Sequence, residues 1–390
     1  MIPRYDPTYR LRDLFGAWRK CSTGDPESEL RARLKDIYRV RHAFLFDHAR
    51  TALFAVLKAH GRPGDVLMPA YNCIVVPEAV ESAGYRPRFV DIDRRSLGAT
   101  RGALAKALTP DTTAVLPTHM FGIPCDVEEV VEFGREHGLL VIEDAAPAMG
   151  AEVRGKYVGL FGDAAIISFQ ATKVIAGEDG GALLTDNDEL ADKVSRLLDA
   201  ARAPYPGWLY FLRAALRKIA LRPLVYRLVI VGYRALGKEV MYEVVRPSPG
   251  EPDKILKRCP RFSSALALVQ LDRLPENLER RRRLARIYFE GLASHPDITL
   301  PTVPEQGSPA WIQFPISVRD KRGFYRHMKK HGVDMSWTYR YSCAESYGRD
   351  DFPEALNAAR TVLGLPTYPS LTDKAARHIC DVAKKYTAAE

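Results

Sequence analysis

The 390-residue sequence is poor in cysteine, and its cysteines are not spaced for metal binding. The six are scattered, without a CxxC pair or a Cys/His spacing typical of a zinc site. This excludes a disulfide scaffold and predicts reduced thiols in a cytoplasmic protein. The N-terminal stretch MIPRYDPTYRLRDLFGAW is broken by proline and charge before any apolar run develops, so we do not expect a signal peptide.

Internal repeats, low-complexity stretches and signs of disorder are also lacking. Apolar residues make up 46% and charged residues 27%, as in soluble globular proteins. The length predicts a large domain and a smaller one. The formal net charge of +9 favours an anionic partner such as a phosphorylated small molecule, an acidic membrane surface or nucleic acid. Because no nucleic-acid recognition module is present, we do not expect nucleic acid to be the partner.

Short apolar runs alternate with amphipathic stretches through the first half of the chain. Helices are predicted at 27–40, 48–61, 76–83, 100–108 and 127–137, and strands at 65–69, 86–90, 114–117, 139–142, 164–168 and 181–185. This alternation predicts an α/β fold with a mainly parallel sheet covered by helices on both faces. In such sheets ligands bind beyond the carboxyl ends of the strands, so the residues that follow each strand are candidates for function.

Residues 205–237 differ in composition from the rest. Apolar and aromatic residues alternate there with six cations: Arg213, Arg217, Lys218, Arg222, Arg227 and Arg234. Charge and Pro223 interrupt the segment too often for one membrane-spanning helix. Two interpretations remain open: a lid or subunit-interface element, which is slightly favoured, and a pair of basic amphipathic helices at a membrane surface.

The remaining chain reads as a second, smaller α+β region with long helical runs and the strand-like stretch WIQFPISV. We therefore predict a large domain over residues 1–204, a basic amphipathic insert over 205–257 and a small C-terminal domain over 258–390. The RRRR run within it is interpreted as a solvated helix face.

Three stretches of the middle region carry residues suited to one kind of chemistry. LLVIEDAAPAMGA places Asp144 at the end of a buried strand, GDAAIISFQATK carries Ser168 and Lys173 just beyond the next, and EDGGALLTD is a glycine-rich return. Alone, a lysine or aspartate at a strand end is usually a surface residue. Together, they suit pyridoxal phosphate (PLP) chemistry. Lys173 would bind the cofactor covalently and Asp144 would hold its pyridine nitrogen protonated. Ser168 and the helix start at Ala49, Arg50 and Thr51 would hold the phosphate.

The same stretches resemble the DegT/DnrJ/EryC1/StrS family of nucleotide-sugar aminotransferases, whose typical strings are EDAAQA, SFHxxK and GEGG. GDVLMPAYNC, GYRPRFVDID, PTHMFGIPCDVEEV and LGLPTYPSLTD are similar as well. The resemblance implies PLP fold type I, like aspartate aminotransferase, with a mainly parallel seven-stranded-type sheet and a smaller C-terminal α+β domain. It further implies a homodimer that moves an amino group, commonly from glutamate, to a nucleotide-linked keto-sugar.

By position, the resemblance makes Lys173 the Schiff-base lysine and proton shuttle, Asp144 the partner of the ring nitrogen and Ser168 a phosphate ligand. Arg50 and Thr51 fall where the family often has Gly-Thr. His119 matches a frequent histidine of the family and is equally interpreted as a structural residue. Arg261 is retained as a contact to the partner subunit.

Four positions depart from the family pattern. Pro147 replaces a glutamine that supports the ring hydroxyl, and Cys73 replaces an aromatic residue that stacks on the ring. Cys259 replaces an asparagine that reaches the partner subunit's phosphate, and Gln170 replaces the histidine of SFHxxK. These changes leave the covalent chemistry intact but alter the substrate pocket.

The leading prediction is a PLP-dependent aminotransferase that acts on a keto-sugar or related carbohydrate, linked to a nucleotide or a lipid. One alternative is a PLP-dependent sugar dehydratase or lyase, but the resemblance implies a histidine in place of Lys173 for that chemistry. The other is a non-catalytic, membrane-associated scaffold. We expect a cytoplasmic protein, and the lipid-linked hypothesis adds peripheral contact with the inner face of an anionic membrane.

Overall fold

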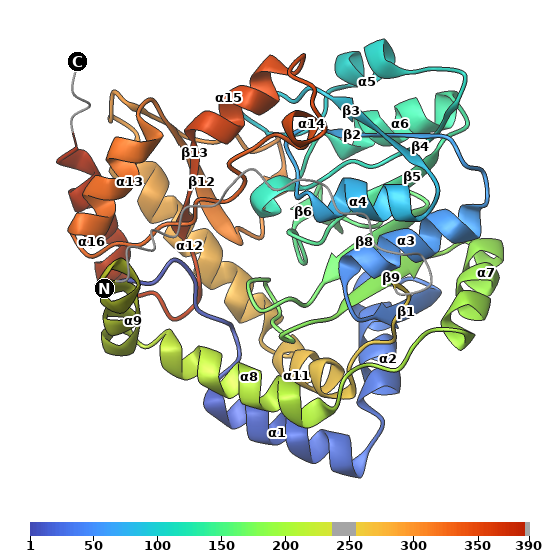
Figure 1. The fold of residues 1–390 in the computed structure, drawn as a ribbon, viewed down its shortest axis with the longest axis horizontal. Coiled ribbons are helices and arrows are strands. Elements are labelled where there is room, and N and C mark those ends of the chain that lie inside the picture. Colours follow the sequence, from blue (N-terminus) through green and yellow to red (C-terminus); the bar gives the residue numbers. More distant parts are fainter. Residues whose placement is uncertain (236–254, 387–390) are drawn as a thin grey trace.

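The computed structural model describes residues 1–235 and 255–386, and its centre is a seven-stranded sheet (Figure 1). The strand order is β1-β9-β8-β5-β4-β2-β3. Only β9 runs opposite to the other six, because it pairs antiparallel with β1 and β8. The sheet is therefore mainly parallel, as predicted. The bounds are β1 His42–Phe46, β2 Asp65–Pro69, β3 Arg86–Val90, β4 Thr112–Val115, β5 Leu140–Asp144, β8 Ala164–Ser168 and β9 Gly181–Thr185.

Helices cover both faces of this sheet. One face packs against α3 (Ala49–His60), α4 (Val75–Ser82) and α7 (Asp188–Asp199). The other packs against α2 (Pro26–Tyr38), α5 (Arg101–Ala107), α6 (Val127–Glu136) and α11 (Arg261–Leu271). Neighbouring side chains alternate between the two cores, so Ile166 faces the first and Ile167 the second. Burial on both faces explains why these strands read as continuous apolar runs.

The sequence missed some elements and shifted others. It did not predict α1 (Leu11–Thr23), whose buried Leu14 and Ala17 pack in a small core with α11. It predicted a strand at 114–117, whereas the corresponding strand, β4, is Thr112–Val115. Proline has no N–H to donate to a ladder, which favours an end of the strand before Pro117.

A second, three-stranded sheet lies beside the first. It contains β10 (Ile298–Thr299), β12 (Gln313–Val318) and β13 (Val362–Pro366). Its core is shared with α12 (Leu274–Leu292), α13 (Lys321–Lys330) and α16 (Asp373–Lys384). The short elements are β6 (Glu152–Val153), β7 (Lys156–Tyr157), η1 (Met120–Gly122), β11 (Gly307–Ser308), α14 (Cys343–Ser346) and α15 (Pro353–Thr361). The division into domains at 204 and 257 stays a prediction.

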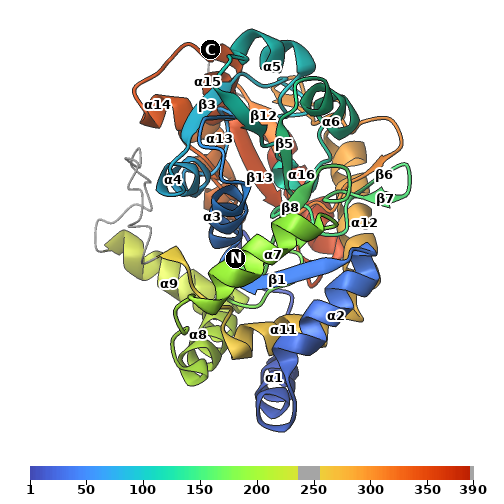
Figure 2. The same ribbon diagram turned by 90° about the vertical axis from the view of Figure 1, so that its right-hand side faces the viewer.

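The described part of the predicted insert contains the helices α8 (Gly207–Ala220) and α9 (Pro223–Ala235). Residues 236–254 of the predicted segment lie outside the described residues. The two flanks of the insert lie side by side: the N–H of Arg202 donates to Leu256 O, and that of Arg258 to Arg202 O, both at 3.0 Å. α8 lies beside α1 and α11 (Figures 1 and 2). Phe211 of α8 makes edge-to-face ring contacts with Phe15 and Trp18 of α1.

Candidate active site

A cavity of about 850 Å³ lies beyond the carboxyl ends of β5 and β8. Asp144 is the last residue of β5, and Lys173 follows β8, the next strand in the sheet. Both side chains line this cavity. The sheet thus brings together two residues that are 29 positions apart, at the edge where α/β sheets bind ligands.

Burial changes the protonation chemistry of this pair. It lowers the pKa of the Lys173 amine, and the charge of Asp144 opposes that shift only in part. Burial also raises the pKa of Asp144, against the charge of Lys173 and a hydrogen bond from the N–H of Ala146. A buried amine of lowered pKa is neutral more of the time and is therefore a better nucleophile.

The start of α3 forms one end of the cavity. Ala49 and Arg50 line it together with His48, which precedes the helix. The N–H groups of Thr51 and Ala52 donate to His48 O. The N–H groups of Ala49 and Arg50 precede these bonds and have no partner in the same helix, so they are suited to an anion. Gly181 permits the close approach of β9, because a Cβ atom there would lie 2.4 Å from the backbone nitrogen of Ala49.

The glycine-rich return after Lys173 carries two acids. Glu178 is fully buried, has a positive φ of 73° and accepts hydrogen bonds from Tyr9 Oη and Arg217 Nε. Asp179 lines the cavity and binds Arg213 of α8. Helix α8 of the insert therefore binds the segment that follows Lys173 through two arginine–carboxylate pairs.

The other predicted site residues divide into two groups. Cys73, Pro147, Ser168 and Gln170 line the cavity with Asp144 and Lys173. Thr51 does not: its hydroxyl donates to Asp47 at 2.6 Å, and its side chain is buried.

His119, Cys259 and Arg261 also lie outside the cavity lining. His119 is fully buried between Glu143 Oε2, at 3.1 Å from its Nε2, and the N–H of Cys125, which donates to its Nδ1. Cys259 is buried, and its sulfur accepts from Ser264 Oγ. Arg261 donates to carbonyl groups of Cys21 and Gly24 at the end of α1.

Sequence reasoning missed a loop that closes the cavity from the small sheet. Trp337, Tyr339 and Arg340 line it, and the ring of Tyr339 lies 5.5 Å from that of Tyr71. Asn72, Asp179 and Arg213 were missed as lining residues as well. Only the fold brings these positions together. The apolar-aromatic stretch SWTYRYSC was the one signal in the sequence that could have marked the loop.

Comparison with known proteins now decides the family. The model of the DegT/DnrJ/EryC1/StrS aminotransferase family matches residues 15–207 and 257–384, which is most of the chain. The chain belongs to this family. Residues 208–256, which include nearly all of α8 and all of α9, fall between the two matched segments.

Two relatives match most of this chain. The dTDP-4-dehydro-2,3,6-trideoxy-D-glucose 4-aminotransferase of Saccharopolyspora spinosa is 32% identical over 336 residues, 83% of this chain and 78% of that protein. The spore coat polysaccharide biosynthesis protein SpsC of Bacillus subtilis (strain 168) is 30% identical over 349 residues, 85% of this chain and 82% of that protein.

Among solved structures, the aminotransferase TlmJ from Streptoalloteichus hindustanus superposes with a TM-score of 0.80 at 24% identity and covers 98% of each chain. The predicted family, PLP fold type I and the aminotransferase class are confirmed. Family and fold are those of PLP-dependent enzymes.

The cavity of this family member suits PLP by the chemistry of its groups. Lys173 offers an amine for the aldehyde, and Asp144 a carboxylate for the pyridine nitrogen. Ser168 and the first N–H groups of α3 offer donors for the phosphate. The aldehyde, the ring nitrogen and the phosphate of the cofactor thus each have a suitable group in one cavity.

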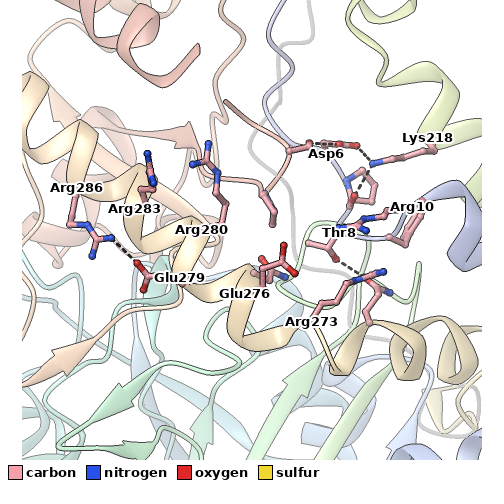
Figure 3. A pocket seen from close by; sticks show the side chains of 16 residues that line it. Asp6, Thr8, Arg10, Lys218, Arg273, Glu276, Glu279, Arg280, Arg283 and Arg286 are labelled. Atoms are coloured by element: carbon pink, nitrogen blue, oxygen red, sulfur yellow. Dashed lines mark hydrogen bonds and ion pairs between the residues drawn. The ribbon is translucent and has the colours of Figure 1, made fainter. Parts of the chain in front are cut away.

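A smaller cavity of about 490 Å³ lies on the other side of the N-terminal segment (Figure 3). Residues 6–10 line this one, whereas Arg4 and Tyr5 line the larger one. Its cations are Arg10, Lys218, Arg273, Arg280, Arg283 and Arg286. In Figure 3, Lys218 reaches Asp6 and Arg286 turns to Glu279.

None of the helices in the described ranges 1–235 and 255–386 is both long and apolar enough to cross a lipid bilayer.

Proposed function

We propose that this aminotransferase binds PLP in the 850 Å³ cavity and moves an amino group from glutamate to a keto-sugar. The observation that carries the proposal is the pair of a partly buried Lys173 and a buried Asp144 at adjacent strand ends, facing the start of α3. The printed names of both relatives, a 4-dehydro-sugar aminotransferase and a polysaccharide biosynthesis protein, support a carbohydrate acceptor.

When bound, the cofactor would supply an electron sink for the negative charge that develops at the substrate carbon. Asp144 would accept the hydrogen bond of the protonated ring nitrogen, because its carboxylate lies at the end of β5. Lys173 would take the proton from the substrate carbon, since its lowered pKa favours the neutral amine. The loop with Trp337 and Tyr339 would exclude water from the reacting atoms.

The visible absorption of the purified protein with PLP, before and after glutamate, tests this proposal. We expect a band of lysine-bound cofactor that disappears on addition of glutamate, and no such band in Lys173→Ala. The exposed Lys193→Ala serves as a control with an unchanged spectrum. A band that ignores glutamate would favour another donor or the lyase alternative. No band at all in excess PLP would overturn the proposal and favour the scaffold.

We further propose that α1, α8 and α9 together form a surface that binds an anionic membrane, named here the insert surface. Among the side chains that the structure describes, at residues 1–228, 230 and 255–386, all large apolar ones that are exposed belong to α1 or to residues 205–228. They are Leu11, Phe15, Trp18, Tyr205, Trp208, Leu209, Leu212, Leu216, Ile219, Leu224 and Leu228. An exposed apolar patch of this kind marks an interaction site.

Charge favours a lipid occupant for the insert surface. The sequence from 200 to 238 contains no aspartate or glutamate. Exposed Arg12, Arg19, Arg222 and Arg227 flank the apolar side chains. Two copies of this surface would repel each other, whereas anionic headgroups would attract it. We propose that the homodimer implied by the family forms through another surface.

Cosedimentation with vesicles tests the insert surface. We expect binding to phosphatidylglycerol vesicles, weak binding to phosphatidylcholine vesicles, and loss of both in Trp208→Ser/Leu212→Ser. The exposed Arg326→Ser on α13 is the control. Equal sedimentation of the double variant and the parent protein would contradict the proposal.

The acceptor would then be a lipid-linked keto-sugar, because one helix, α8, both carries the insert surface and contributes Arg213 to the cavity. Lipid-linked and nucleotide-linked keto-sugars, offered to the same preparation, distinguish the two carriers. A turnover with the nucleotide-linked sugar alone would contradict the lipid-linked acceptor and leave the aminotransferase proposal in place.

A further inference from the structure

Of the insert residues that the structure describes, Arg213 alone lines the larger cavity. α8 lies almost entirely outside the two segments that match the family, yet Arg213 lines the cavity of Lys173. Its guanidinium group makes two hydrogen bonds with Asp179, from Nη1 to Oδ2 at 3.1 Å and from Nη2 to Oδ1 at 3.0 Å. Such a two-pronged pair fixes both partners in orientation.

Asp179 lies where a negative charge is unfavourable. It lines the cavity at the same end as His48, Ala49 and Arg50, where the cofactor phosphate is expected. It is buried and stays ionised: burial raises its pKa, but the hydrogen bonds and charges of His48 and Arg213 outweigh burial and lower it. An unmasked carboxylate would repel a phosphate dianion and oppose the helix start.

Arg213 and His48 approach Asp179 together. The imidazole Nε2 of His48 lies 3.6 Å from Asp179 Oδ1, and its Nδ1 lies 3.1 Å from Asp47 Oδ2. His48 thus serves two carboxylates, which leaves Arg213 as the partner with two short hydrogen bonds to Asp179. Arg217 of the same helix binds Glu178, whose Oε2 also lies 3.4 Å from Arg213 Nε.

We propose that Arg213 is a positioning residue for the cofactor: it masks the charge of Asp179 so that the start of α3 accepts the phosphate. The helix α8 is thereby part of the cofactor site, although it lies almost entirely outside the two segments that match the family. This inference rests on the proposed binding of PLP. It assigns Arg213 a role through Asp179 and predicts that removal of both charges is better tolerated than removal of the arginine alone.

The test is the affinity for PLP, measured by titration of the cofactor-free protein and followed by absorption. We expect Arg213→Ala to weaken PLP binding about tenfold or more, because the carboxylate is left unmasked beside the phosphate. Asp179→Asn/Arg213→Ala should recover affinity to within about threefold of the parent protein, and Asp179→Asn alone should bind at least as well as the parent. The exposed Arg326→Ala on α13, outside both cavities and the insert surface, is the matched control and should not change the affinity.

Two results would overturn the role of Arg213. One is an unchanged affinity in Arg213→Ala. The other is a loss that Asp179→Asn does not recover, which would point to direct phosphate contact or to a purely structural effect. The melting temperature of each cofactor-free variant identifies the structural effect. Failure of the parent protein to bind PLP would overturn the proposed function and this inference with it, whereas normal binding by the parent and by Arg213→Ala overturns this inference alone.

Discussion

The two cavities differ in how their charges are paired. The smaller one has six cations in its lining, and five of them bind carboxylates: Lys218 to Asp6, Arg273 to Asp13, Arg280 and Arg283 to Asp373, and Arg286 to Glu279. The larger one holds a partly buried lysine, Lys173, and a buried aspartate, Asp144, both with shifted pKa values. The number of charges that line a cavity therefore does not indicate a reactive site. A buried ionisable group whose charge is only partly compensated by its neighbours is the better indicator.

The largest effect is expected at Asp144. Asp144→Asn keeps the shape of the side chain but removes the charge that would hold the ring nitrogen protonated. We expect amino transfer to fall by about 10²–10⁴-fold, measured as glutamate-dependent single turnover. A loss of less than threefold would show that Asp144 is not part of the reactive pair. The contrast drawn between the two cavities would then be wrong.

Gly181→Ala should damage the larger cavity without any change of charge. The added methyl group would lie 2.4 Å from the backbone nitrogen of Ala49 and push the start of α3 away from β9. We expect a loss of stability of about 1–3 kcal/mol and weaker PLP binding, from urea unfolding and PLP titration. Gly102→Ala is the control, because a Cβ atom at Gly102 of α5 meets no other atom within 4 Å. Equal stability of both variants would show that β9 can shift freely.

Lys321 tests whether burial lowers the pKa of a lysine outside the larger cavity. Burial and the nearby charge of Arg340 lower its pKa from 10.5 to about 7, and its amine donates to Ala359 O at 2.7 Å. Between these two pKa values the unfolded chain binds more protons than the folded chain, so stability rises with pH. From pH 7 to pH 9 the parent protein should gain about 2 kcal/mol more than Lys321→Met. Urea unfolding at both pH values measures this difference, and parallel changes in the two proteins would contradict the shifted pKa.

Arg283→Ala in the smaller cavity should have the smallest effect. Arg283 is 59% exposed and shares Asp373 with Arg280. We expect the stability to change by less than about 1 kcal/mol and the PLP affinity not at all. A large loss of PLP binding in Arg283→Ala would contradict the distinction between the two cavities.

The sequence was informative where local patterns and order along the chain decide the structure. The runs that became β2, β8 and β9 were placed at their observed bounds, because strands buried on both faces are continuous and apolar. β3 was also placed at its bounds, although only Phe89 and Val90 of it are buried. Lys173 and Asp144 were found because strand ends mark ligand sites. By contrast, the contact of Arg213 with Asp179 joins a segment outside the matched family segments to the glycine-rich turn, and the loop with Trp337 comes from the second sheet. Only the tertiary structure brings such pairs together.

The paired flanks of the insert have one more consequence. Because Arg202 is hydrogen-bonded to Leu256 and Arg258, the chain leaves and rejoins the family fold at almost the same point. A module with adjacent ends can be gained, lost or transplanted while the strands around it keep their order. If both proposals for the insert hold, a shorter relative that received residues 203–256 at the same junction would acquire a membrane-binding surface and an arginine at its cofactor site in one evolutionary step.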